Sequence, residues 1–210
     1  MNKMIRLLLM LLVVPLAASA QFQFADRLPD ATTTTESHGL VVDNNGNVWN
    51  GIYNSRLVND GAERRNFVAV FDSEGNELDF SPIWSVTIDD ELVRFGPVTG
   101  VSKGIDGNIY VSVHGWRTTA APTDAAPNPI IGNVWNQTRS FIYVLDAEDG
   151  SFIERVEVTY PRIETAAHAP NRAAVTEDGF VAVSFVFPGS PIVILDPNDG
   201  WSVLNTLTTA

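Results

Sequence analysis

The stretch HGLVVDNNGNVWNGIY, residues 38–53, decides the fold because its pattern occurs three times along the chain. It consists of an apolar strand, a tight turn that ends in glycine, and a second apolar strand. The pattern returns as TGVSKGIDGNIYVSVH from Thr99 and as NRAAVTEDGFVAVSF from Asn171. Segments that repeat in this way are typical of architectures in which each unit buries its apolar face against its neighbour.

A second hairpin follows each copy of this pattern. These hairpins begin at Phe67, Phe141 and Pro191, and their turns end at Gly75, Gly150 and Gly200. The repeating unit therefore contains four antiparallel strands. This unit predicts an all-β protein built of four-stranded β-propeller blades.

We expect three blades, at about residues 38–97, 98–170 and 171–210, with residues 77–86 and 202–208 as the fourth strands of the first and last. Propellers have about four to eight blades, so three cannot close a ring. We expect the chain to be a fragment whose missing C-terminal blades complete a six- to seven-bladed ring. The alternative is a homodimer in which two chains form one six-bladed ring.

The first 20 residues have the order of a secretory signal peptide: the charged MNKMIR, the apolar LLLMLLVVPLA, and small residues ending at Ala20. The apolar run is too short for a permanent span, which needs about 20 residues. We therefore expect a secreted or periplasmic protein with no membrane span after cleavage. Residues 21–37 should contain a short N-terminal strand, from the alternation around Phe22 and Phe24, and a polar loop.

Charge and cysteine content narrow the range of partners. The chain has 13 basic and 25 acidic residues, a net charge of −12, so it should repel phosphate backbones, and we expect no nucleic-acid partner. It contains no cysteine, which excludes disulfides and thiolate chemistry. The turn sequences Asp-Asn-Asn-Gly and Asp-Ser-Glu-Gly lack the ligand series of a calcium loop and are interpreted as hairpin turns.

Candidate catalytic residues come from the starts of the first strands of the blades, which meet at the channel mouth of a propeller. His38 and His168 occupy comparable positions there, and with a carboxylate such as Glu36 they would suit a zinc or general-base site. The alternative is that both histidines only bond the backbone at strand starts. Arg172 lies at the same end and is a candidate ligand-binding residue.

A long irregular loop in the second blade, RTTAAPTDAAPNPIIGNVWNQTR, is flanked by Trp116 and contains Trp135. Loops of this length often cover a site. The two tryptophans could stack on a sugar or another flat ligand, or they could fill gaps between blades. We therefore expect a small molecule, a carbohydrate or a protein as ligand.

The sequence from His38 to Trp49 resembles the inner hairpin of NHL-type repeats and of the streptogramin-lyase group. The segment Ala169-Pro170-Asn171 resembles gluconolactonase-like propellers, and that resemblance implies that Asn171 and Glu36 are ligands of a divalent metal, Ca²⁺ or Zn²⁺. The sequence departs from that family in lacking Glu-Gly-Pro. In addition, Ser184 stands where the family has an aspartate.

These features predict an exported β-propeller that acts as a binding or interaction module. The alternative function is a metal-dependent lactonase or lyase of the same superfamily. In that reaction a divalent ion would polarise a ring ester or carbonyl oxygen, and His38 or His168 would move the proton.

Overall fold

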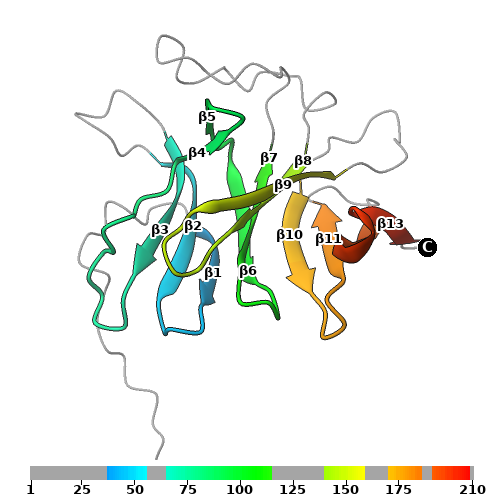
Figure 1. Cartoon of the computed structure of the whole chain (residues 1–210), viewed down its shortest axis with the longest axis horizontal. Helices are drawn as coiled ribbons and strands as arrows, with labels where there is room; N and C mark the ends of the chain where they lie inside the picture. Colours follow the sequence, from blue (N-terminus) through cyan, green and yellow to red (C-terminus); the bar gives the residue numbers. More distant parts are fainter. Residues whose placement is uncertain (1–36, 56–64, 115–139, 159–169, 186–190, 209–210) are drawn as a thin grey trace, which may run out of the picture.

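The computed structural model describes residues 37–55, 65–114, 140–158, 170–185 and 191–208 (Figure 1). Its strands are β1 Ser37–Val42, β2 Val48–Ser55, β3 Arg65–Phe71, β4 Ser85–Ile88, β5 Glu91–Arg94, β6 Val98–Lys103, β7 Ile109–His114, β8 Ser140–Leu145, β9 Phe152–Val158, β10 Pro170–Val175, β11 Val181–Phe185, β12 Ile192–Asp196 and β13 Ser202–Leu207. In this part of the chain, no helix is long and apolar enough to cross a membrane.

The strands form consecutive antiparallel sheets that fan out side by side (Figure 1). Blade 1 contains β1-β2-β3, blade 2 contains β6-β7-β8-β9, and blade 3 contains β10-β11-β12-β13. The chain is thus an all-β protein of the β-propeller class, as the repeats predict. The four-stranded blade is confirmed for blades 2 and 3, including a last strand at Ser202–Leu207.

The fourth strand expected at residues 77–86 of blade 1 is wrong. This segment pairs with β3 through isolated bridges, from Phe71 to Glu77 and from Val68 to Ile83, and not as a continuous strand. Pro82 lies within the segment, and proline lacks the N–H group that a continuous ladder needs. The chain then forms the separate two-stranded sheet β4-β5.

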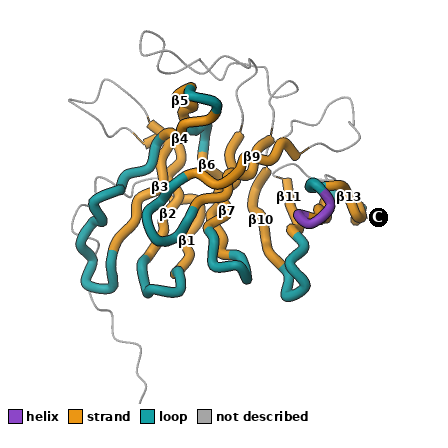
Figure 2. The backbone as a smooth tube through the Cα atoms, in the orientation of Figure 1, coloured by secondary structure: helices purple, strands orange, loops and turns teal. Residues whose placement is uncertain are grey.

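The turns that follow β1, β3, β6 and β10 lie at one end of the blades (Figure 2). The turn glycines have positive φ, as the turn type requires. They are Gly46, Gly75, Gly107, Gly150, Gly179 and Gly200. Aspartate side chains brace several of these turns by accepting hydrogen bonds from the backbone. In the turn after β1, Asp43 Oδ1 accepts from the N–H groups of Asn45 (2.8 Å) and Asn47 (2.9 Å).

The Asp43 carboxylate also connects its turn to the core. Its Oδ2 accepts from Trp49 Nε1 at 2.9 Å, and Asp43 is 5% exposed. The equivalent Asp72 accepts the same turn hydrogen bonds from Glu74 and Asn76, but it lies at the surface and no indole reaches it. Asp43 therefore braces a turn and also satisfies the polar atom of the largest buried side chain.

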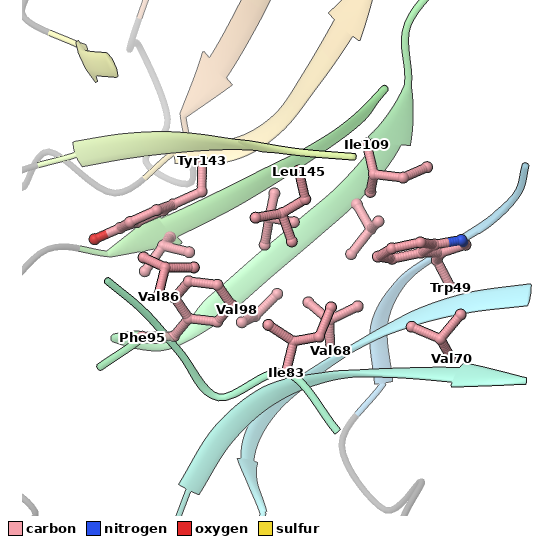
Figure 3. Packing of buried hydrophobic residues seen from close by; sticks show 13 residues of the cluster. Trp49, Val68, Val70, Ile83, Val86, Phe95, Val98, Ile109, Tyr143 and Leu145 are labelled. Carbon is pink, nitrogen blue, oxygen red and sulfur yellow. The ribbon is translucent and has the colours of Figure 1, made fainter. Parts of the chain in front are cut away.

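Blades 1 and 2 enclose the main hydrophobic core. Trp49, Val68 and Val70 of blade 1 face Ile109 and Leu145 of blade 2, and Figure 3 shows these side chains pointing toward one another. A second core lies between blades 2 and 3. It includes Ile142, Val144, Val183 and Val193. Each blade is therefore stabilised mainly by its neighbours.

The inner strands β1, β6 and β10 approach one another closely at two glycines. A Cβ added to Gly39 would lie 2.5 Å from Val101 N, and one added to Gly100 would lie 2.5 Å from Asn171 O. Both distances are shorter than any normal contact, so no side chain fits without moving backbone. Each of these glycines stands seven residues before the turn glycine of its blade. The residue at the same position in blade 3 is Arg172.

We expect Asp43→Asn to reduce the free energy of unfolding by about 1–3 kcal/mol, because an amide nitrogen would face the donors of Trp49 and Asn47 or the amide would lose its turn contacts. Asp72→Asn is the matched control and should leave the urea midpoint close to that of the wild type. Equal losses in the two variants would contradict the role given to Trp49.

The Asp43 effect should depend on pH. Burial raises the pKa of Asp43, but hydrogen bonds from Trp49, Asn47 and Asn45 lower it by more, so the pKa lies below its ordinary value of 3.8. A carboxylate with a lowered folded-state pKa stabilises the protein above its unfolded pKa, and this stabilisation is lost as pH falls through the folded pKa. The deficit of Asp43→Asn should therefore shrink below pH 3.8 in urea titrations. A deficit that stays constant would contradict this assignment.

Gly100→Ala should reduce the free energy of unfolding by about 1–3 kcal/mol, because the new methyl group overlaps the backbone of β10. Arg172→Ala, in the matching position of blade 3, should change it far less because that side chain is exposed. Urea unfolding of both variants measures the difference. A Gly100→Ala variant as stable as the wild type would mean that the strands are farther apart than described.

Candidate binding site at the starts of the inner strands

Each inner strand has an irregular pairing register at its first residues, which lie at the end far from its hairpin turn. The register shifts between Ser37 and Gly39 in β1, between Val98 and Gly100 in β6, and between Pro170 and Arg172 in β10. One residue is therefore extra in each strand. These extra residues, called here the bulge residues, are His38, Thr99 and Asn171.

The glycine contacts place the bulge residues at one level. Gly39 is packed against β6 at Gly100 and Val101, and Gly100 is packed against β10 at Asn171 and Arg172. The three strand starts therefore lie next to one another, at the end opposite the hairpin turns (Figure 1). Bulges often re-aim side chains beside functional sites. This end of the inner strands is the candidate site.

Thr99 is a connector between blades and is not available to a ligand. It is 5% exposed, and its hydroxyl group donates to the carbonyl oxygen of Pro170. Ser112, which is fully buried, accepts from the N–H group of Ala173 at 3.1 Å. Two hydroxyl groups of blade 2 thus hold the start of β10 on both sides of Asn171 and Arg172.

His38 lies at the surface with one face covered. Its ring stacks on that of Tyr53, with centroids 4.8 Å apart and an angle of 22° between the planes. Beside it, Ser37 Oγ donates to Oδ1 of the buried Asn50 at 2.5 Å. The stacked ring has a fixed orientation while its edge remains exposed, so it could contact a ligand.

Asn171 and Arg172 are both exposed on β10. The other basic side chains described have partners: Lys103 Nζ donates to Asn44 at 3.0 Å, Arg94 lies over the ring of Trp84, and Arg155 lies over that of Phe141. Within the described residues, Arg172 makes no such contact. The candidate site therefore presents one guanidinium group and one amide, both exposed.

The other residues predicted for the site lie outside the described residues. These are Glu36, His168, Trp116 and Trp135. Among the described residues, no three His, Asp or Glu side chains lie close enough together to hold a metal ion. His38 and Asn171 are brought to the same end of the blades, and their catalytic and metal-binding roles stay predictions.

Sequence reasoning pointed to the strand starts but missed the bulges and the connecting hydroxyl groups. A bulge is defined by the partner strand, so a single strand gives no sign of it. The role of Ser112 was equally hidden, because its contact is with another blade. One signal was present in the sequence. The residue seven positions before the turn glycine is a glycine in blades 1 and 2, at Gly39 and Gly100, but it is Arg172 in blade 3.

Comparison with known proteins gives structural matches alone, since neither a protein-family model nor a curated protein matches the chain. The chain is similar to a protein of unknown function from Bacteroides caccae, with 13% identity and a TM-score of 0.47 over 83% of this chain and 46% of that one. It is also similar to a catalytically inactive virginiamycin B lyase from Staphylococcus aureus with quinupristin, with 12% identity and a TM-score of 0.42 over 80% of this chain and 40% of the lyase.

A third similar structure is a proposed gluconolactonase, with 12% identity and a TM-score of 0.43 over 83% of this chain and 48% of that protein. Streptogramin lyases and gluconolactonases are two of the three groups that the sequence resembles, besides NHL-type repeats. The chain spans less than half the length of each of these three structures.

Proposed function

We propose that this chain is an exported binding module whose ligand contacts the starts of the inner strands. The observation that carries the proposal is the alignment of three bulged strand starts, with exposed His38, Asn171 and Arg172 at one end of the blades. The signal-peptide pattern of the first 20 residues supports export.

The rigidity of this end also supports binding. The start of β10 is held by hydroxyl groups of Thr99 and Ser112, and the His38 ring is held by Tyr53. Side chains that are already oriented lose less conformational entropy when a ligand binds. The opposite end of the same strands consists of hairpin turns, in which aspartates such as Asp43 and Asp106 are occupied by backbone hydrogen bonds.

Binding is favoured over catalysis because of what the described residues offer. A general base needs a proton-accepting group beside a second group that orients it. His38 is oriented by ring stacking on Tyr53, and among the described residues no carboxylate accepts a hydrogen bond from it. The function supported best is thus recognition, and the ligand class is a small molecule or an exposed group of a larger one.

A defined fragment library, screened against the isotope-labelled full chain by nuclear magnetic resonance, tests this proposal. Bound fragments should shift the backbone signals of Ser37–Gly39, Gly100 and Asn171–Arg172. His38→Ala combined with Asn171→Ala should weaken these hits. The control, Asn44→Ala combined with Glu177→Ala, removes exposed polar groups at the turn end and should not.

The outcome that would contradict the proposal is equally specific. If the fragments shifted only the turn-end signals, or if the His38 and Asn171 variant bound every fragment as the wild type does, the site would be elsewhere. A loss of fragment binding on addition of a chelator, restored by calcium or zinc, would instead favour the metal-dependent alternative.

A further inference from the structure

The position of Arg172 distinguishes blade 3 from the other two blades. In blades 1 and 2 the matching residues are Gly39 and Gly100, where a Cβ would lie 2.5 Å from backbone atoms of the next inner strand. A residue with a long side chain at this position cannot be followed by an inner strand at the same spacing. Among the described inner strands, β10 is thus the one that has a side chain at this position.

The backbone that carries Arg172 is fixed on the blade 2 side. The Thr99 hydroxyl group donates to Pro170 O, and Ser112 Oγ accepts from Ala173 N at 3.1 Å. Ala173, the next residue, is fully buried against blade 2. Since side chains alternate along a strand, Arg172 points to the opposite face, where it is exposed.

The other described basic side chains have partners within the described residues. Lys103 Nζ donates to the amide oxygen of Asn44, and Arg94 and Arg155 lie over aromatic rings. Arg172 makes no ion pair with any described residue. A guanidinium group has a planar fork of N–H donors that fits a carboxylate or a phosphate with two parallel hydrogen bonds.

We propose that Arg172 binds an oxyanion, a carboxylate or phosphate group, of the ligand. This inference rests on the proposed function, because it assigns a ligand class to the same site. In the other two described blades the matching residue is a glycine in contact with neighbouring backbone, so a guanidinium group is present at this position in blade 3 alone among the described blades. The hydroxyl groups of Thr99 and Ser112 hold the backbone that carries Arg172 in place before a ligand binds.

Benzoate, inorganic phosphate and the neutral isostere benzamide are the probes for the test. Titration of the labelled full chain with benzoate or phosphate should shift the Arg172 Nε–Hε signal, whereas benzamide should bind more weakly. Arg172→Gln should weaken oxyanion binding about tenfold or more, because charge-assisted hydrogen bonds are lost. Lys103→Gln is the control, since it removes one positive charge from the other end of the neighbouring inner strand.

The proposal would be overturned by any of three results. These are no shift of the Arg172 signal with either oxyanion, equal binding of benzoate and benzamide, and equal losses in Arg172→Gln and Lys103→Gln. The spectrum of Arg172→Gln also shows whether the fold is retained. If neutral fragments bound at the bulge residues and oxyanions did not, the proposed function would stand while the ligand class would be wrong.

Discussion

The close contact between the inner strands is the constraint on which the rest of the structure depends. At Gly39 and Gly100 the backbone of one strand occupies the space that a side chain of its neighbour would need. This contact sets the distance between blades, and so it sets how the apolar faces meet. The clusters of buried side chains around Trp49 and Val183 lie between blades whose inner strands are this close.

The same contact connects the fold to the candidate site. Because the strands are in contact at one level, the bulges that precede the glycines are also at one level, and His38 and Asn171 are brought to the same end of the molecule. Hydrogen bonds between blades 2 and 3 also fix the start of β10. Thr99 and Ser112 use their hydroxyl groups on β10, and in this way they hold the backbone on either side of the exposed Asn171 and Arg172.

Local chemistry could be predicted from the sequence, and relations between blades could not. The hairpins are encoded within a few residues: an aspartate such as Asp43 accepts backbone hydrogen bonds, and a glycine such as Gly46 adopts positive φ. The strand expected at residues 77–86 is interrupted at Pro82, which lacks the N–H group that a continuous ladder needs. The bulges and the Ser112 contact depend on partner strands far along the chain, and periodicity carries no information about them.

The most direct test of this account is a measurement of proton contacts between the inner strands in solution. Nuclear Overhauser effects should connect the Gly39 Hα protons with the Val101 amide proton, and the Gly100 Hα protons with the Hα of Arg172, because the backbones meet at these glycines. Strong cross-peaks at both places are the predicted result. If the strands within each blade gave their expected cross-peaks and these two contacts were absent, the blades would not be packed as described, and the candidate site would not be assembled.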